Sequence, residues 1–290
     1  KKKPDILVIL GDRYEMIAGP LACLDKNIPI IHIHGGAVTY GAIDENIRHS
    51  LTKLSNFHIV SHEKYLKRII QMGESPDTVF DVGCTEIEYL SSHFTEIKSR
   101  EINEIGVGDD INLEFPFLIV LFHPVTTSSN NRENTSKLLR AVYETNLPTI
   151  WFWPNVDAGT DDIAKSIRIF REKENTKNMH FMIYLPASKF AALLKKTSCL
   201  VGNSSAGIKE CSYLGVPAVN IGTRQSGRFR GKNVVDVDFN SINIKKAIEK
   251  QVKHGNYGKD EFYFKEDCSS NIVEILVNTG ISPQKRFYEG

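Results

Sequence analysis

Short apolar runs and longer amphipathic stretches alternate along the first part of the chain. The apolar runs are rich in β-branched residues, as strands are, and the stretches between them repeat their apolar positions at helical spacing. Strands that are apolar on both faces and alternate with helices predict a parallel sheet covered by helices. The expected strands are "DILVIL", "IPIIHI", "FHIVS" and "TVFDVG", and the expected helices begin near residues 15, 44 and 63.

A second series of the same kind follows a polar interruption. Residues 91–116 are polar and charged and end in a proline, so we place a domain boundary in this segment. Beyond it we expect strands at "FLIVLFHP", "TIWFWP", "MHFMIYLP", "SCLVGNSS" and "VPAVNIG", helices between them, and two closing helices from residue 241 on. The pattern therefore predicts an α/β protein with two domains, residues 1–110 and 111–290.

The composition limits the possible functions. The chain has 290 residues, of which 41% are hydrophobic, and can bury two ordinary cores. Its 36 Lys and Arg residues nearly balance its 35 Asp and Glu residues, which argues against nucleic-acid binding and requires any anionic ligand to be held locally. No apolar stretch approaches the roughly 18 residues that cross a bilayer, so no membrane partner is expected. The five cysteines form no CxxC pair, which predicts reduced thiols in a cytoplasmic protein without a zinc knuckle.

Polar residues follow several expected strands at the end where open parallel sheets bind ligands. Asp12 and Arg13 follow the first strand, His123 follows the first strand of the second domain, and Asn155 follows the next. Two of them have a simpler interpretation: Asp12 can be the N-cap of the following helix, and a lone histidine such as His123 is more often structural than functional. Their shared position favours a ligand site.

The segment "VGNSSAGIKE", residues 201–210, is the strongest local motif. A glycine permits a tight turn after a strand, and Ser204 and Ser205 stand where a helix begins, so hydroxyl and backbone N–H groups can converge on a phosphate. Glu210, six residues beyond Ser204 on the same expected helix, can accept both hydroxyls of a ribose. The alternative is that one serine only caps the helix. Downstream, Arg224 opens a cluster of cations that fits a pyrophosphate clamp.

The loop "HIHGG" admits two interpretations. His32 and His34 lie two residues apart, on one face of a strand, a spacing that can serve a metal. We favour no metal, because no third ligand with fitting spacing stands out, and we expect the glycines to take positive φ or pass close to a ligand. Further on, Asp44 is expected to cap a helix, with Arg48 one turn along the same face. That pair can stabilise the helix or orient a functional carboxylate.

Together these motifs resemble the hydrolysing UDP-N-acetylglucosamine 2-epimerases of sialic-acid-type sugar biosynthesis. The resemblance runs in order through "GDRYE", "HIHGG", "GAIDENIRHSLTKLSNFHIVS", "HPVTT", "WPNVDAG", "VGNSSAGIKE" and "GVPAVNIGTRQSGR". It implies a GT-B-type architecture, in which two Rossmann-like domains hold a nucleotide sugar in a cleft. The catalytic set that it implies is Asp12, Asp44, Arg48 and His123, with His34 where members often have a glutamate. The UDP-binding set that it implies is Arg13, His123, Asn155, Leu185, Ser204, Ser205, Glu210 and Arg224.

The resemblance also implies a reaction. Enzymes of this kind are thought to remove the proton at C2 of the sugar, expel UDP to leave a glycal, and add water at C1 with reprotonation at C2 from the other face. That chemistry needs two proton-handling groups and cationic or N–H help for the departing diphosphate. The products are UDP and free N-acetylmannosamine, or an analogue from a UDP-diacetamido sugar. Neither a redox cofactor nor a metal is required, and a homo-oligomer is expected.

Two departures from the family keep other functions open. His34 either replaces the usual glutamate as an acid or base, which a pKa near 6.5 permits, or indicates an altered substrate. By resemblance, members begin with roughly another 90 to 100 residues, the larger part of a small domain, so we expect the first domain to be incomplete and the chain alone to have weak or no activity. The alternatives are a non-hydrolysing 2-epimerase, a GT-B glycosyltransferase and an inactive nucleotide-sugar-binding module.

Overall fold

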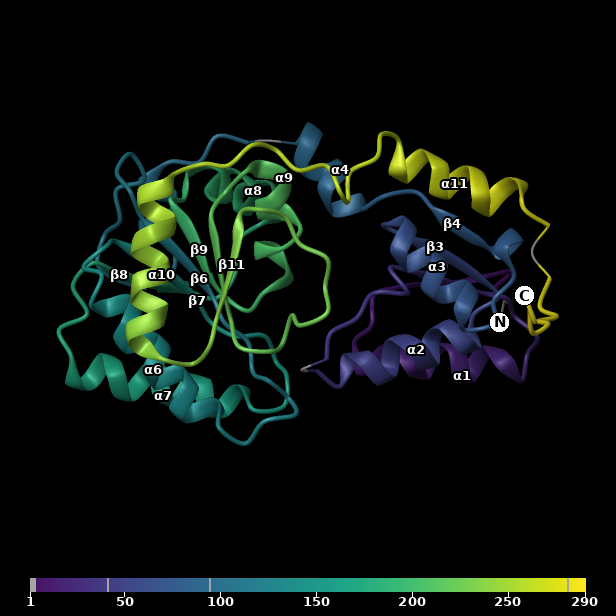
Figure 1. Ribbon diagram of the computed structural model, residues 1–290, viewed down its shortest axis with the longest axis horizontal. Coiled ribbons are helices and arrows are strands. Elements are labelled where there is room, and N and C mark those ends of the chain that lie inside the picture. Colours follow the sequence, from purple (N-terminus) through teal and green to yellow (C-terminus); the bar gives the residue numbers. More distant parts are fainter. Residues whose placement is uncertain (1–3, 41, 94, 281) are drawn as a thin grey trace. The chain divides into compact units, whose positions relative to one another are not determined.

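A computed structural model describes residues 4–40, 42–93, 95–280 and 282–290, which form two compact units (Figure 1). Unit 1 takes the described residues of 1–39, 43–89 and 262–290, and unit 2 takes those of 40–42 and 90–261. Each unit contains a mainly parallel sheet with helices on its faces. The α/β pattern read from the sequence is therefore present twice.

The sheet of unit 1 has four parallel strands in the order β1-β2-β3-β4. Because side chains alternate along each strand, Ile31, Ile33 and Ile59 lie in one apolar cluster, and Ile9 and Ile30 lie in another. Its strands are β1 (Leu7–Leu10), β2 (Ile30–Ile33), β3 (Phe57–Val60) and β4 (Val79–Asp81). Its helical segments are η1 (Tyr14–Ile17), α1 (Ala18–Leu24), α2 (Asp44–Leu54), α3 (Glu63–Gln71), η2 (Pro76–Thr78), α4 (Thr85–Ser92), whose end passes into unit 2, and α11 (Cys268–Asn278).

The sheet of unit 2 has the order β11-β10-β9-β6-β7-β8-β5, and only β5 runs antiparallel to its neighbour. One apolar cluster joins this sheet to α6, α7 and α10, and a second joins it to α5, α8 and α9. Its strands are β5 (Val107–Gly108), β6 (Leu118–Leu121), β7 (Thr149–Phe152), β8 (Met179–Met182), β9 (Cys199–Gly202), β10 (Ala218–Ile221) and β11 (Val234–Val237). Its helical segments are α5 (Ser99–Asn103), α6 (Asn131–Tyr143), α7 (Thr160–Lys173), α8 (Ala187–Lys196), η3 (Ser205–Gly207), α9 (Glu210–Leu214) and α10 (Ser241–His254).

The units differ from the predicted domains 1–110 and 111–290 at both ends of unit 2. Ile97 and Ile102 belong to the core of unit 2, so the first boundary lies earlier, after Tyr89. The last helix, expected to close the second domain, packs Ile272, with Ile275 and Leu276, against the sheet of unit 1. The prediction was wrong there because an apolar stripe shows that a helix is amphipathic without showing which sheet it covers.

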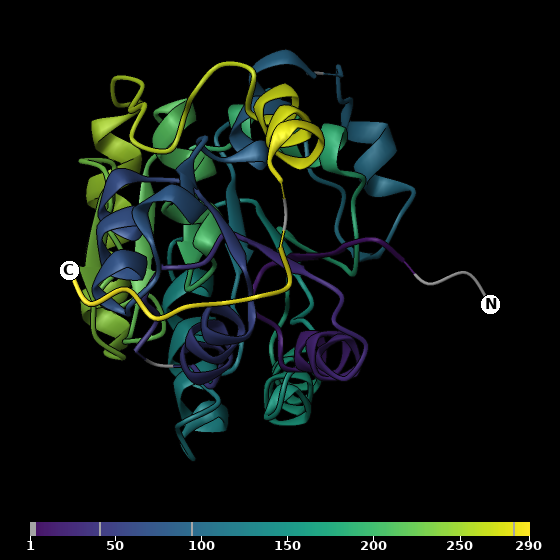
Figure 2. The same cartoon turned by 90° about the vertical axis from the view of Figure 1, so that its right-hand side faces the viewer.

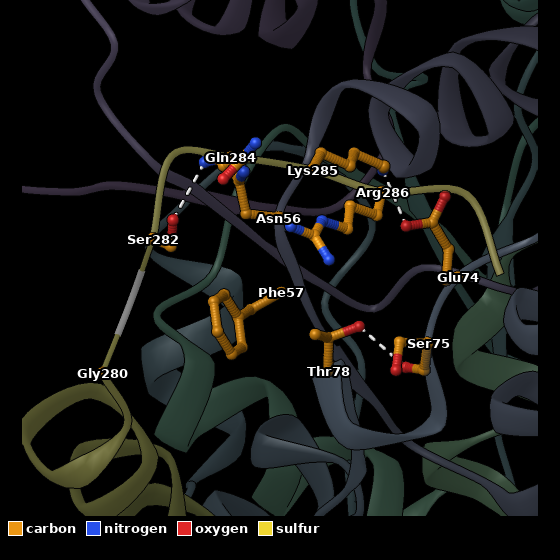
Figure 3. Close-up of a pocket in the computed structure, with 10 residues that line it drawn as sticks. All are labelled: Asn56, Phe57, Glu74, Ser75, Thr78, Gly280, Ser282, Gln284, Lys285 and Arg286. Carbon is orange, nitrogen blue, oxygen red and sulfur yellow. Dashed lines mark hydrogen bonds and ion pairs between the residues drawn. The ribbon is translucent and has the colours of Figure 1, made fainter.

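After α11 the chain runs across unit 1 as an extended segment (Figure 2). It is held at the amino ends of the strands, where Asn56 donates to the Pro283 carbonyl and the Tyr288 N–H donates to the Gly73 carbonyl. In Figure 3 Lys285 of this segment points toward the buried Glu74, beside a cavity of about 320 Å³. The C-terminal segment is therefore part of the packing of unit 1.

Candidate functional site

Arg48 makes five side-chain hydrogen bonds at the carboxyl edge of the unit 1 sheet. It lies on α2 and is 0% exposed. Its Nε and Nη2 donate to Asp12 Oδ2 at 2.8 and 2.6 Å, and its Nη1 donates to Glu45 Oε2 at 2.6 Å. Nη1 also donates to the Ala37 carbonyl, and Nη2 to the Thr39 hydroxyl. A buried guanidinium with this many acceptors holds the Asp12 carboxylate in one orientation.

The turn that carries Asp12 is fixed by its neighbours. Gly11 has a φ of 85°, which glycine adopts without strain, and its N–H donates to the Ile33 carbonyl. The His32 Nε2 lies 2.8 Å from the Gly11 carbonyl oxygen. Burial lowers the pKa of His32 to about 4, although the contact with Gly11 opposes that shift, so the ring is neutral at neutral pH and donates to this carbonyl. His32 thus has a structural role, tying the end of β1 to β2.

The start of α2 differs from the prediction by one residue. Asp44 is the first residue of the helix rather than its cap, because the preceding Ile43 takes the cap position. Glu45, which the sequence reasoning passed over, bonds Arg48, His49 Nε2 and the Thr39 N–H. Burial raises the pKa of Glu45, but these bonds outweigh it and bring the value to about 2. The i,i+3 spacing of Glu45 and Arg48 was the available signal.

The loop after β2 contains two residues with a left-handed backbone conformation. His34 itself takes a left-handed φ of 71°, unusual for a residue with a Cβ, and Gly36 takes 73°. A Cβ on Gly36 would lie 2.6 Å from the Tyr65 carbonyl oxygen, so the close approach is to α3. The positive φ expected for the two glycines is therefore confirmed for Gly36 and not for Gly35.

His34 lies beside two residues that the sequence did not connect with it. Its Nε2 is 3.4 Å from Glu86 Oε2, and Cys84 Sγ is 3.0 Å from the same oxygen. Cys84 follows β4 and Glu86 lies in the first turn of α4. The sequence argument looked for a third ligand with fitting spacing beside His32 and His34, and it missed Cys84 and Glu86 because they follow another strand of the same sheet.

In unit 2 the candidate residues gather around the point where the strand order reverses. The chain runs from β6 to β7 and β8 on one side, then returns to β9 and β10 on the other. Ligands of open α/β sheets bind at such a switch point, beyond the carboxyl ends of the strands. His123 follows β6 and Asn203 follows β9, and each exchanges a hydrogen bond with the other at 2.8 Å. Asn203, which the predicted site omitted, holds the two strand ends together.

The end of β9 requires a residue without a Cβ at Gly202. Its φ is 141°, and a Cβ there would lie 1.9 Å from the Leu121 carbonyl oxygen of β6. The serine motif then begins: the Ser204 hydroxyl accepts the Ala206 N–H, and Ser205 starts a 3-10 turn. Glu210 is not on the same helix as Ser204, as was expected, because the turn ends at Gly207 and α9 begins at Glu210. This N-cap bond agrees with the simpler interpretation of Ser204, and it leaves a ligand role open.

The remaining predicted UDP-binding residues divide between the units. In unit 2, Asn155 and Leu185 follow β7 and β8, and the Asn155 N–H donates to His123 Nδ1 at 3.3 Å. Arg224 follows β10 and donates to the Asn203 carbonyl at 3.1 Å. Arg13 belongs to unit 1, where it pairs with Glu15 on the surface. Five neighbouring strands of unit 2, from β10 to β8, therefore each carry a predicted residue beyond their carboxyl end.

None of the helices in the described part of the chain is long and apolar enough to cross a bilayer.

Two units, each built on a mainly parallel sheet covered by helices and each with polar side chains beyond the carboxyl ends of its strands, define an α/β protein of GT-B type. The family model described as UDP-N-acetylglucosamine 2-epimerase matches residues 1–277. The chain belongs to this family.

The curated relatives agree with this assignment. The chain is 34% identical to the polysialic acid biosynthesis protein P7 of Escherichia coli, over 98% of the chain and 73% of that protein. It is 35% identical to the GDP/UDP-N,N'-diacetylbacillosamine 2-epimerase (hydrolyzing) of Campylobacter jejuni, over 86% of the chain and 63% of that protein. The chain thus spans between three fifths and three quarters of these two relatives.

Solved structures show the same fold. The UDP-GlcNAc 2-epimerase of Methanocaldococcus jannaschii, in complex with UDP-GlcNAc and UDP, matches with a TM-score of 0.79 at 17% identity, over 96% of this chain and 77% of that one. The Neisseria meningitidis enzyme bound to UDP-GlcNAc matches with a TM-score of 0.77 at 20% identity, over 95% and 77%. At these identities the likeness establishes the fold.

Proposed function

We propose that this protein is a hydrolysing 2-epimerase that acts on a UDP-linked N-acetylated amino sugar, either UDP-N-acetylglucosamine or a UDP-diacetamido sugar. The observation that carries the proposal is the Asp12–Arg48 pair, a carboxylate held by a fully buried guanidinium at the ligand-binding edge of a parallel sheet. Two relatives are described as hydrolysing 2-epimerases, which supports the choice of reaction.

In this proposal unit 1 carries out the proton transfers. Asp12 and Asp44 are the acid and base that exchange the proton at C2 of the sugar, and Arg48 is the positioning residue that orients Asp12. His34 is the third proton-handling candidate. Loss of the C2 proton and cleavage of the C1–O bond release UDP and form a glycal. Water then adds at C1 while C2 regains a proton from the opposite face, so one water is consumed for each UDP released.

Unit 2 binds the nucleotide. His123 stands at the switch point, and Ser204, Ser205 and Arg224 supply hydroxyl, N–H and guanidinium donors for the diphosphate. Asn155 and Leu185 line the neighbouring strand ends, and Glu210 is assigned to the ribose hydroxyls. Arg13 is assigned to the nucleotide by resemblance to the family.

The test of the reaction is proton NMR in deuterium oxide, with UDP-N-acetylglucosamine and a UDP-diacetamido sugar as alternative substrates. We expect UDP and a free 2-epimerised sugar with deuterium at C2. A UDP-linked epimer would mean non-hydrolysing epimerisation, and release of UDP with protium kept at C2 would mean glycosyl transfer or hydrolysis. UDP binding without turnover of either sugar would favour a binding module.

Two pairs of variants assign the roles. Asp12→Asn should lower kcat at least about 100-fold, as loss of a general acid or base does, whereas the exposed Asp77→Asn in the same unit should not. Arg224→Met should weaken UDP binding in calorimetry by about tenfold or more, since it removes a charge-assisted donor, and the exposed Arg168→Met on α7 is its control. Equal kcat in Asp12→Asn and Asp77→Asn would contradict the catalytic assignment.

A further inference from the structure

Three side chains with metal-binding atoms converge at the carboxyl edge of the unit 1 sheet. Among the described residues, His34, Cys84 and Glu86 are the one group of at least three such side chains whose ligand atoms all lie within 4.8 Å of one another. They come from two strand ends, since His34 follows β2 and the other two follow β4. Because β3 lies between these strands, the group depends on the folded sheet.

The separations suit a single small ion. In a tetrahedral zinc site with the usual bond lengths, nitrogen and oxygen ligands lie about 3.3 Å apart and sulfur and oxygen ligands about 3.6 Å apart. His34 Nε2 and Glu86 Oε2 are 3.4 Å apart. Cys84 Sγ is 3.0 Å from the same oxygen, the distance of an S–H···O hydrogen bond. Replacing that proton by an ion requires the sulfur to move by only about 0.6 Å.

The three ligands differ in how firmly they are held. The His34 side chain is 10% exposed, and its backbone N–H donates to the Ile59 carbonyl at 2.8 Å. Cys84 is 0% exposed, and its N–H donates to the Tyr263 carbonyl at 2.9 Å. Glu86 is 45% exposed and can adjust. With His34 and Cys84 held in place and the Glu86 carboxylate able to move, the three side chains can coordinate an ion without a change in the backbone.

The donor set identifies the class of ion. A thiolate and an imidazole favour zinc-like divalent ions, whereas Mg²⁺ and Ca²⁺ prefer all-oxygen sites. Three protein ligands leave a fourth position for water, as catalytic zinc sites do, while structural sites are closed by four.

We propose that His34, Cys84 and Glu86 bind one zinc-class divalent ion with an open fourth position. On binding, the Cys84 thiol loses its proton to solvent and the ion takes Nε2 of His34. That nitrogen is then no longer an acid or base, and a metal-bound water, whose pKa can lie near 7, stands in its place. The site does not depend on the proposed epimerase reaction, since its occupancy is measured by binding.

The experiment uses the full chain without a polyhistidine tag, freed of metal by a chelator. Titration with Co²⁺ should give one bound ion per chain, proton release, and the thiolate-to-cobalt charge-transfer absorption, which requires a sulfur ligand. Zn²⁺ added afterwards should displace the cobalt and abolish the band. Cys84→Ser should remove the band, and Glu86→Gln should weaken binding by at least about tenfold.

The matched control is Cys23→Ser, which alters another buried cysteine of unit 1 on α1. It should keep the band and the stoichiometry of the parent chain. Circular dichroism of each metal-free variant shows whether it is folded, so that loss of a metal ligand can be distinguished from loss of the fold. Cys84→Ala is a second substitution at this position for the same comparison. A chain that binds no cobalt stoichiometrically, or a band that persists in folded Cys84→Ser, would overturn the proposal.

Discussion

The two ends of the unit 1 sheet each bury one charge, with opposite signs. At the carboxyl end the cation Arg48 is surrounded by the carboxylates of Asp12 and Glu45. At the amino end the anion Glu74, 2% exposed, receives Lys53, Lys285 and His58 at 2.6, 2.7 and 3.0 Å. The electrostatic arrangement is similar, but only the carboxyl end stands where parallel sheets bind ligands.

The residues that bond Arg48 and those that bond Glu74 come from different parts of the chain, and this distinguishes the two ends of the sheet. Arg48 donates to residues that follow two neighbouring strands, β1 and β2, and so positions a partly exposed carboxylate at the edge where open parallel sheets bind ligands. Glu74 is bonded by Lys285 of the C-terminal segment, whose ammonium also donates to the carbonyls of Thr52 and Ser55. The amino-end cluster therefore fastens the end of the chain. A buried ion pair alone does not indicate catalysis, and its position in the fold has to be considered as well.

The largest expected effect comes from removing the buried cation. Arg48→Met should lower the free energy of unfolding by about 3–5 kcal/mol, because it leaves two partly buried carboxylates, 25% and 20% exposed, without the cation that they share. Urea unfolding at pH 7 measures this, with Arg48→Lys as the charge-preserving comparison. Because lysine cannot make the two-pronged bond to Asp12, it should recover only part of the loss. An unchanged midpoint in Arg48→Met would show that the cluster contributes little.

A smaller effect is expected at the other end. Glu74→Gln should lower the free energy of unfolding by about 1.5–3 kcal/mol, the range for hydrogen bonds to charged groups, because Lys53 can turn toward water while Lys285 loses its anchor. The C-terminal segment should then be released, and trypsin should cleave after Lys285 or Arg286 sooner than in the parent chain. Arg48→Met should not accelerate this cleavage under conditions where it remains folded. Equal release in both variants would remove the distinction between the two ends.

Both clusters should weaken in acid. Burial raises the pKa of Glu74, but bonds from His58, Lys285 and Lys53 prevail and bring it to about 2, as for Glu45. Carboxylates with lowered pKa stabilise the fold above their ordinary pKa of 4.5, and that stability is lost as the pH falls toward 2. Each cluster should lose about 1–2 kcal/mol between pH 5 and pH 3.

Unfolding curves at intervals across that range measure the loss. Glu74→Gln and Glu45→Gln should each flatten the dependence on pH. Burial also lowers the pKa of His58, although Glu74 opposes the shift. As the pH falls, the unfolded chain therefore binds a proton at His58 before the folded chain does. The free energy of unfolding should begin to fall below about pH 6.5, the ordinary pKa of histidine. A parent chain equally stable at pH 5 and pH 3 would contradict the role of both carboxylates.

The smallest effect is expected for an ion pair on the surface. Glu63 and Lys67 on α3 lie 2.5 Å apart with both side chains about two thirds exposed, and solvent screens them. Glu63→Gln should leave the thermal midpoint, the tryptic release of the C-terminus and the pH profile unchanged. This variant is the reference for the preceding three, since it removes a carboxylate of the same unit without removing a buried charge.

Much of the fold could be predicted because it depends on local pattern. The apolar runs predicted β1 to β4 and β6 to β10 within a few residues, and the polar edge residues marked the carboxyl ends of the strands. The weak strands β5 and β11 were missed, since β5 is two residues long and Val107 is exposed, and β11 is only partly buried. Strands with so little apolar burial leave no clear period in the sequence.

The sequence by itself determined the class of fold, the glycines at strand ends and the residue types proposed to handle protons and phosphate. The tertiary structure decided which of these residues meet. It joined Arg48 to Asp12 across 36 positions, brought Cys84 and Glu86 to His34 across another strand, and placed α11 on unit 1. The period of apolar positions predicts which side of its own helix or strand a residue faces. Which other residues it contacts depends on the order of the strands and on which sheet each helix covers.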